Sequence, residues 1–359
     1  MHIEYLQAQN VRNLTNIELT PGPRLNLFTG PNASGKTALL EAIYILSRGR
    51  SFRTTRMTEV IQHHQESLFV AAELNQSLAK PVRTGVVKTP GKTVIRYDGE
   101  IIKRTSDQAK NLPVVLIAPD THRLITGEPR QRRHWLDWGM FHVEPNYLTL
   151  WRDYHKSLRQ RNVLLKSGRF EKDLLAGWEL AMADTGTRIS LLRRNFIQNI
   201  QKTIKELLEN RDIDPPELKY LQGWNEGENL HDCLARERPV DKQMGYTRSG
   251  IHRADIEFII EGRSLSSVFS RGRIKQFVAA LLLAQTVVIQ DITGQRPVVL
   301  IDDFGAEIDA DTRSRLVNML SERDIQAFIT STEPNQELVK HLGTEMFHVE
   351  HGELRKVVK

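Results

Sequence analysis

The spacing of apolar and polar residues divides the chain into three regions. In the first, up to about residue 120, apolar and polar positions alternate over short runs, a pattern typical of β-strands. Turn residues separate these runs, as at Pro90-Gly91 and Asp98-Gly99. This region is therefore predicted to be rich in strands, which we place at 3–9, 15–20, 25–28, 67–74, 82–88, 92–97 and 114–118.

The second region, from about 130 to 212, has few turn residues, and its apolar positions recur at helical spacing. The stretch 174–210 contains no proline and, as a single helix, would be about 55 Å long. Pro215-Pro216 ends the helical region, and a loose polar stretch follows from 222 to 245. The pattern predicts a helical segment inserted into a strand-rich protein.

Strands and helices alternate in the third region. We expect strands at 256–261, 298–301 and 326–330, with helices at 275–290 and 312–322 between them. This order is that of an α/β fold.

The sharpest motif follows the strand predicted at 25–28. Residues 30–37 fit the phosphate-binding pattern G-x-x-x-x-G-K-[S/T], and apolar positions after them predict a helix. Such a loop turns backbone N–H groups toward a phosphate, its lysine reaches the terminal phosphates, and its hydroxyl binds Mg²⁺. We therefore expect Lys36 to take part in catalysis and Thr37 to bind the metal. The nucleotide-binding residues are Gly30, Pro31, Asn32, Ala33, Ser34, Gly35, Lys36 and Thr37.

The second motif is a pair of acidic residues after the apolar strand predicted at 298–301. Asp302 and Asp303 come at its C-terminal end, where α/β sheets place their sites. We expect Asp302 to hold Mg²⁺ through water and Asp303 to act as the general base that orients the attacking water. The long interval between this motif and Lys36 implies a large insertion, which the helical region supplies.

A third motif opens the helix predicted at 275–290. Ser270-Arg271-Gly272 resembles the signature motif of ABC ATPases, whose usual form is Ser-x-Gly-Gln, although Arg273 stands in the glutamine position. The resemblance implies that Ser270 and Gly272 contact ATP held by a second subunit, in an ATP-dependent homodimer. Residues 306–309 resemble the D-loop of the same family.

Two further stretches narrow the resemblance. Residues 118–137 carry the pattern P-D, an apolar pair, G-x-P-x-x-R-R, an aromatic residue and L-D, and residues 247–255 contain a Gly-x-His-Arg segment. Over its whole length the chain resembles the RecF family of bacterial recombination and repair ATPases, which are related to SMC and Rad50 proteins. The resemblance implies an α/β, P-loop ABC-type ATPase head with mixed β-sheets, interrupted by a helical arm domain. The head would comprise 1–125 and 241–359, and the arm 126–240.

The same resemblance implies a role in DNA repair. ATP, with Mg²⁺, would stabilise a head dimer that clasps DNA, and hydrolysis would release it. Members of the family act at gapped or stalled replication DNA and, with RecR and RecO mediator proteins, promote RecA loading and the SOS response. The expected partners are a RecR-like mediator and single-stranded, double-stranded or gapped DNA.

Composition adds less than the motifs do. The 50 lysines and arginines exceed the 44 aspartates and glutamates by six, and 40% of residues are hydrophobic, as in ordinary globular proteins. The arginines cluster, which is typical either of a dispersed DNA-contacting surface or of solvated faces with salt-bridge partners. The clusters are Arg48, Arg50, Arg53 and Arg56; Arg123, Arg130, Arg132 and Arg133; Arg188, Arg193 and Arg194; and Arg263, Arg271, Arg273 and Lys275.

The single cysteine, Cys233, excludes an intramolecular disulfide and favours a reducing compartment. The N-terminus runs directly into strand-like sequence, and the longest apolar run, 277–284, is too short to span a bilayer. We therefore expect no signal peptide and a cytoplasmic location.

Three other classes of protein fit less well. A transporter ATPase subunit would carry a tighter signature motif and a switch histidine after the last strand, where this chain has Thr330-Ser331-Thr332. Asp120 likewise stands where ABC ATPases carry a glutamine, and whether Thr330 or Thr332 senses the γ-phosphate stays open. A chromosome-holding SMC protein would need hundreds of residues of heptad repeat, and a related nuclease would need another acidic domain.

Overall fold

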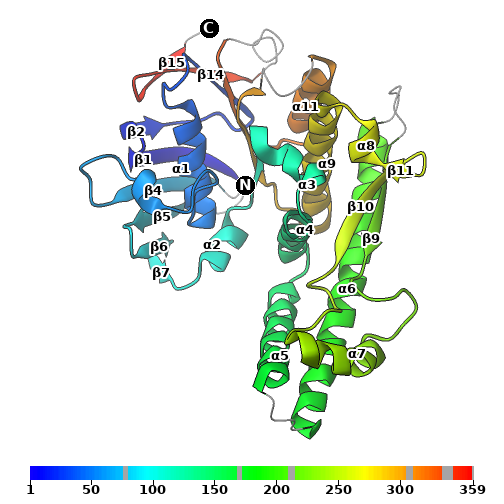
Figure 1. Ribbon diagram of the computed structural model, residues 1–359. Coiled ribbons are helices and arrows are strands. Elements are labelled where there is room, and N and C mark those ends of the chain that lie inside the picture. Colours follow the sequence, from blue (N-terminus) through cyan, green and yellow to red (C-terminus); the bar gives the residue numbers. More distant parts are fainter. Residues whose placement is uncertain (76–79, 168–171, 209–214, 305–309, 334–342, 358–359) are drawn as a thin grey trace. The chain divides into compact units, whose positions relative to one another are not determined.

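Two units make up the protein, and the first is built from both ends of the chain. The computed structural model describes residues 1–75, 80–167, 172–208, 215–304, 310–333 and 343–357 (Figure 1). Unit 1 comprises Met1–Thr121 with Lys275–Lys359, and unit 2 comprises His122–Ile274.

Unit 1 contains an antiparallel sheet formed by the N-terminal region. Strand β4 (Leu68–Asn75) alternates fully buried and partly buried positions throughout, because only one face of the sheet packs against the core. In spatial order the strands are β2 (Leu14–Leu19), β1 (His2–Val11), β4, β5 (Val82–Lys88), β6 (Thr93–Tyr97) and β7 (Glu100–Ile102). The predicted strands of the first region are thus confirmed, and β7 is an addition.

A second sheet in unit 1 joins distant parts of the sequence. Four of its strands, β3, β13, β12 and β8, pair in parallel and are apolar and almost wholly buried, as expected for strands covered on both faces. Two strands that the sequence did not predict, β14 and β15, extend it beyond β3. The order is β15 (Glu353–Val357), β14 (Glu345–Glu350), β3 (Leu25–Thr29), β13 (Ala327–Ser331), β12 (Val298–Ile301) and β8 (Val114–Ile117).

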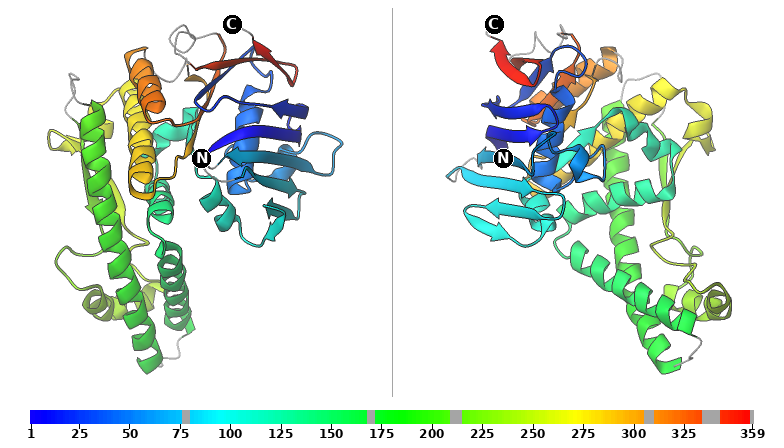
Figure 2. Two further views of the ribbon diagram at one scale, coloured as in Figure 1. Left: turned by 180° about the vertical axis from the view of Figure 1, so that it is seen from behind. Right: turned by 60° about the vertical axis from the view of Figure 1, so that its left-hand side comes forward.

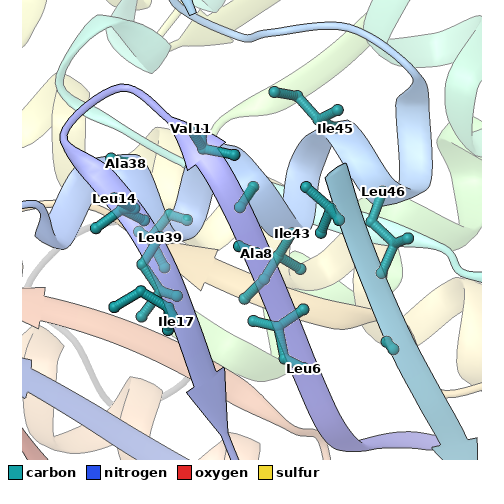
Figure 3. Packing of buried hydrophobic residues seen from close by; sticks show 14 of the residues in the cluster. Leu6, Ala8, Val11, Leu14, Ile17, Ala38, Leu39, Ile43, Ile45 and Leu46 are labelled. Carbon is teal, nitrogen blue, oxygen red and sulfur yellow. The ribbon is translucent and has the colours of Figure 1, made fainter. Parts of the chain in front are cut away.

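Helix α1 (Lys36–Arg48) contributes to a hydrophobic core that includes residues of both sheets. Figure 3 shows its side chains Leu39 and Ile43 beside Leu6 of β1 and Ile17 of β2. The predicted apolar face of this helix is therefore confirmed. Among its described residues, unit 1 also contains the helices η1 (Met57–Glu59), α2 (Thr105–Asn111) and α11 (Ala310–Glu322).

Helix α9 (Arg271–Thr293) begins in unit 2 and continues into unit 1. By length and composition it could cross a membrane, but 72% of its most apolar window is buried inside the protein. Burial of this kind is typical of the core helix of a globular protein.

Unit 2 is mainly helical, as predicted for the inserted region. The long helix expected at 174–210 is α6 (Lys172–Leu208), seen in green in Figure 2. The others are η2 (Pro119–His122), which starts in unit 1, α3 (Arg123–Thr126), α4 (Pro129–Val143), α5 (Tyr147–Ser167), α7 (Leu230–Met244) and α8 (Leu265–Val268). A three-stranded antiparallel sheet, β11 (Arg263–Ser264), β10 (Asp255–Ile260) and β9 (Glu217–Leu221), completes the unit.

The stretch 222–245 differs from the prediction, because α7 occupies its second half. Asn229 caps this helix by accepting a hydrogen bond from the His231 N–H, and Gly245 ends it in the left-handed conformation. Pro239 lies inside the helix, and only a narrow apolar stripe is buried. The internal proline and the small number of apolar positions explain why the sequence pattern did not predict this helix.

Residues 241–274, which the sequence analysis placed in the head, fold with unit 2. Strand β10 pairs with β9, which follows α6, and Arg132 of α4 forms an ion pair with Asp255 at 2.6 Å. Fully buried Arg161 likewise holds Asp241 at 2.8 Å. These contacts join residues that are far apart in the sequence, so the local pattern of apolar and polar positions does not reveal them.

His252 is held in unit 2 by both ring nitrogens. Its Nδ1 lies 2.8 Å from the Tyr154 hydroxyl, and its Nε2 lies 3.0 Å from the Thr247 carbonyl oxygen. Since a carbonyl only accepts, Nε2 carries the proton and Nδ1 accepts from the tyrosine. Burial lowers the pKa of His252 from 6.5 to about 4. The residue is therefore neutral and structural at neutral pH.

We predict that unit 2 loses stability as the pH falls from 7 to 5. The unfolded chain binds a proton at His252 below its ordinary pKa, and the folded chain does not, so the loss begins near pH 6.5 and reaches about 2 kcal/mol at pH 5. Urea unfolding followed by tryptophan fluorescence measures it, because all five tryptophans lie in unit 2: Trp135, Trp138, Trp151, Trp178 and Trp224. His252→Gln should flatten the pH dependence, and an equally steep dependence in that variant would contradict the prediction.

Candidate nucleotide-binding site

The phosphate loop, residues 30–37, connects β3 to α1 as the motif predicts. Gly35 precedes the first turn of α1 with φ +119°, and no side chain caps this helix. The uncapped N–H groups and the helix dipole therefore favour an anion at this end. Lys36 folds back over the loop, donating from Nζ to the carbonyl oxygens of Gly30 and Pro31, both at 2.7 Å. In this position the ammonium can exchange those carbonyls for phosphate oxygens.

The C-terminal hairpin, which the sequence did not predict, packs against this loop. The Gly352 N–H donates to the Ser34 carbonyl oxygen at 2.9 Å. Gly30 has φ +151°, and a Cβ there would lie 2.1 Å from the Val349 carbonyl oxygen of β14. Only glycine fits at Gly30, because both its conformation and the neighbouring backbone exclude a side chain.

A cavity of about 480 Å³ opens over the loop within unit 1. It gathers segments that are far apart in the sequence, and they include both predicted phosphate motifs. The lining residues are Arg12, Asn13, Asn32, Ala33, Ser34, Gly35, Lys36, Thr37, Ala38, Arg53, Pro119, Asp302, Asp303, Thr330, Ser331 and Thr332.

The two predicted metal ligands lie in direct contact. The Thr37 hydroxyl donates to Asp302, with Oγ1 at 2.9 Å from Oδ1 and 3.2 Å from Oδ2. A hydroxyl and a carboxylate are oxygen ligands of the kind Mg²⁺ prefers. Among the described residues no three acidic, histidine or cysteine side chains are grouped so that they could hold a metal ion by themselves, so phosphate and water would complete the shell.

Asp303 has an unusual backbone conformation, with φ +56°. Non-glycine residues in this region cost about 1–3 kcal/mol and cluster at functional sites. Its N–H donates to the Thr330 hydroxyl at 2.9 Å, and that hydroxyl donates to Asp302 Oδ1 at 2.8 Å. The threonine therefore fixes both aspartates of the pair from the neighbouring strand β13.

This geometry bears on which threonine senses the γ-phosphate. Thr330 is buried, and its hydroxyl is committed to the aspartate pair, whereas Thr332 is exposed at the cavity. Thr332 is therefore the more accessible hydroxyl of the two alternatives.

Burial and the aspartates act on Lys36 in opposite directions. Desolvation, the larger effect, lowers the pKa of the ammonium, while the charges of Asp303 and Asp302 raise it. A bound polyphosphate would add negative charge and favour the protonated form.

The loop has room and donors for the phosphates of ATP. The Ser34 side chain is 4% exposed, and its hydroxyl has no hydrogen-bond partner among the described residues. Buried polar atoms without a partner are uncommon, and this one belongs to a phosphate loop. The residues present therefore fit a Mg²⁺-nucleotide complex, which Lys36, Thr37 and Asp302 would hold.

The signature motif lies in unit 2, not in this cavity. Ser270 and Gly272 are exposed at the start of α9 and are not among the described lining residues. The Arg273 N–H lies 3.4 Å from the Ser270 hydroxyl, a long capping contact, and the Arg273 guanidinium lies over the Phe269 ring. The predicted D-loop, 306–309, lies outside the described residues.

The basic clusters divide into exposed and structural members. Arg193 is buried and bound to Asp137, and Arg132 is buried and bound to Asp255, so of the two alternatives these two residues follow the one with salt-bridge partners. Burial lowers the pKa of Arg48 to about 10. Exposed members remain, and they include Arg130 and Arg194.

Two pocket residues, Arg12 and Asn13, were missed by the sequence analysis. They follow β1 in a turn where Arg12 has φ +57°, and nothing in their local pattern signals a site. Arg53 was noted only as part of a basic cluster, although it also lines the cavity.

Known proteins resemble this chain along its full length. The DNA replication and repair protein RecF of Nitrosococcus oceani is 36% identical over 364 residues, covering 100% of both chains. That of Hydrogenovibrio crunogenus is 37% identical over 97% of each chain. The structure of the recombination mediator protein RecF with ATP in the RecFOR pathway has a TM-score of 0.88 at 26% identity, covering 99% of this chain and 98% of that one.

An Smc head bound to the C-winged helix domain of ScpA matches more distantly, with a TM-score of 0.56 at 15% identity over 99% of this chain and 97% of that one, and shows the fold alone. The predicted α/β ATPase-head fold class is thus confirmed. Residues 2–354 match the family model described as RecF/RecN/SMC N terminal domain. With this match and full-length relatives at 36% and 37% identity, the chain belongs to that family and resembles its RecF members over its whole length.

Proposed function

We propose that this protein is an ATP-dependent DNA-binding protein of recombinational repair and replication-fork maintenance. The observation that carries the proposal is the cavity where Lys36, Thr37 and Asp302 meet, in a chain that aligns end to end with proteins named RecF. Its partners are DNA, whether single-stranded, double-stranded or gapped, a second copy of the chain and a RecR-like mediator. Its place is the cytoplasm, where it supports RecA loading at gaps and the SOS response.

The residues of the cavity divide the work of binding and hydrolysis. Lys36 and the N–H groups of the loop bind the phosphates, and Thr37 with Asp302 holds Mg²⁺, which when bound neutralises phosphate charge. Asp303, held by Thr330, orients a water molecule and accepts its proton. The reaction is a Mg²⁺-dependent ATPase step that serves as a switch for DNA binding.

The switch acts through dimerisation of the heads. Ser270 and Gly272 of one copy contact the ATP held by the phosphate loop of the other, because an exposed helix N-terminus offers N–H donors to an anion. The dimer clasps DNA through exposed arginines such as Arg130 and Arg194, and hydrolysis releases it. Contacts to phosphates give little sequence preference.

We predict that Lys36→Ala weakens ATP binding by about 10- to 100-fold, because charge-assisted contacts to phosphate are lost. Asp303→Asn should leave ATP affinity nearly unchanged and slow hydrolysis by at least about 100-fold. Titration with a fluorescent ATP analogue and a phosphate-release assay separate the two effects. Lys92→Ala, an exposed lysine at a turn of the first sheet, is the matched control. ATP binding by Lys36→Ala as tight as that of the control would overturn the assignment.

A separate variant tests ATP-dependent dimerisation. Ser270→Arg should keep the protein at the monomer mass of 41.2 kDa when ATP is present, while ATP binding by its own loop persists. The long cationic side chain fills the position that the partner's nucleotide would take. Light scattering with and without ATP measures the mass, and the nearby exposed Ser267→Arg serves as control. An ATP-dependent dimer of Ser270→Arg would refute the sandwiched arrangement.

DNA binding should weaken steeply with salt. For exposed arginines that contact phosphates, affinity falls by tenfold or more between about 50 and about 200 mM salt. The double variant Arg130→Ser with Arg194→Ser should reduce the slope of log affinity against log salt by about 2. Titrations of duplex, single-stranded and gapped DNA, with and without ATP, measure this slope. Arg83→Ser, which changes an exposed side chain of β5 outside the clusters, is the control, and binding indifferent to salt would exclude phosphate contacts.

A further inference from the structure

A buried carboxylate lies directly behind the nucleotide cavity. Glu41 belongs to α1, just after the phosphate loop, and its side chain is 0% exposed. It belongs to a helix whose other buried positions are mainly apolar. A charge at such a position is costly unless charged partners and hydrogen bonds compensate it, so its partners indicate its role.

The first partner is Arg12, whose guanidinium donates hydrogen bonds to both carboxylate oxygens of Glu41. Arg12 Nε lies 2.9 Å from Oε2 and Nη2 lies 3.0 Å from Oε1, a two-point contact. Hydrogen bonding to Glu41 raises the pKa of Arg12, so the guanidinium stays charged. The ion pair also holds a strained residue in place, since Arg12 has φ +57°. The orientation of this arginine is therefore fixed from behind by Glu41.

The second partner is the turn that carries Arg53. The Ser51 hydroxyl donates to Glu41 Oε1 and accepts from the backbone N–H groups of Arg53 at 2.9 Å and Thr54 at 3.1 Å. Arg53 Nη1 lies 4.0 Å from Glu41 Oε2. One carboxylate thus sets the conformation of the turn and attracts its arginine.

Both arginines line the cavity that contains Lys36. The Arg12 side chain is 22% exposed and that of Arg53 is 49% exposed, so each reaches the open space. Arg12 also donates from Nη1 to the Glu59 carbonyl oxygen. Each terminal nitrogen of a guanidinium carries two N–H groups, so the contacts to Glu41 and Glu59 leave donors for a phosphate.

We propose that Glu41 is a positioning residue that aims Arg12 and Arg53 at the phosphates of a nucleotide bound over the phosphate loop. Glu41 does not touch the nucleotide and acts through the two arginines. The inference rests on the proposed function, because it needs the cavity to bind ATP. A purely structural ion pair would stabilise unit 1 without changing ATP affinity beyond what loss of folding explains.

The test is a cycle of variants in the full-length protein. Glu41→Gln removes the charge and keeps the shape, and we expect about tenfold weaker ATP binding, the loss of about one charge-assisted contact. In a background carrying Arg12→Gln and Arg53→Gln, the same change should cost no further affinity. Calorimetric titration with ATP and Mg²⁺ gives the affinities, and thermal unfolding reports how much of each sample is folded. The control is Glu73→Gln, which breaks the surface ion pair with Arg83 on the first sheet.

Ser51→Ala provides a second route if Glu41→Gln does not fold. It keeps the pair between Glu41 and Arg12 and releases only the turn of Arg53, so ATP affinity should fall by about threefold. ATP binding as tight as wild type in folded Glu41→Gln, an equal loss in the background without the arginines, or an unchanged Ser51→Ala would each overturn the inference. Lys36→Ala separates this failure from that of the proposed function. If it loses ATP binding while folded Glu41→Gln does not, only the positioning role fails.

Discussion

The parallel pairing of β3, β13 and β12 is the constraint on which the candidate site depends. Parallel strands end at the same edge of a sheet, so the segments that follow them converge whatever their separation in sequence. Thr37 follows β3, Asp302 follows β12, and Thr330 lies near the end of β13 between them. The hydrogen bonds from both threonines to Asp302 are a consequence of this order. A single sheet therefore brings a loop from the start of the chain to an acidic pair near its end.

Buried arginines distinguish the structural part of the positive charge from the part available to ligands. Arg161 and Arg193 are fully buried in unit 2, and each is bound to carboxylates: Glu179 and Asp241 for the first, Asp137 for the second. Removing one partner of such a pair lowers the free energy of unfolding by more than the intact pair adds to it, because an unpaired charge is left in a low-dielectric interior. These residues add to the net charge of +6 and offer nothing to DNA. The clustering of arginines along the sequence is thus a weak guide to a binding surface.

Local patterns predicted the parts of the site whose determinants are local. The phosphate loop needs a strand, glycines and a helix in one short stretch, and the β12 motif needs four apolar residues before two aspartates, so both could be read directly. Strand β14, helix α7 and Arg12 could not. Strand β14 is defined by its pairing with β3 at the other end of the chain, and α7 is weakened by Pro239. Arg12 lines the cavity from the turn after β1, and its ion pair is with Glu41, which the sequence shows as one charged residue in an apolar helix.

Helix α9 connects the residue proposed to meet the partner's nucleotide to the strand that precedes the acidic pair. Its N-terminus carries Ser270, and a short connection joins its C-terminus to β12, which ends at Asp302. Thr330 bonds both aspartates, so a shift of β12 relative to β13 changes the hydrogen bonds of Asp302 and Asp303 together. The proposed metal ligand and the proposed water-orienting residue therefore share one hydroxyl as a hydrogen-bond partner, so the two roles assigned to them under the proposed function depend on the same residue of β13.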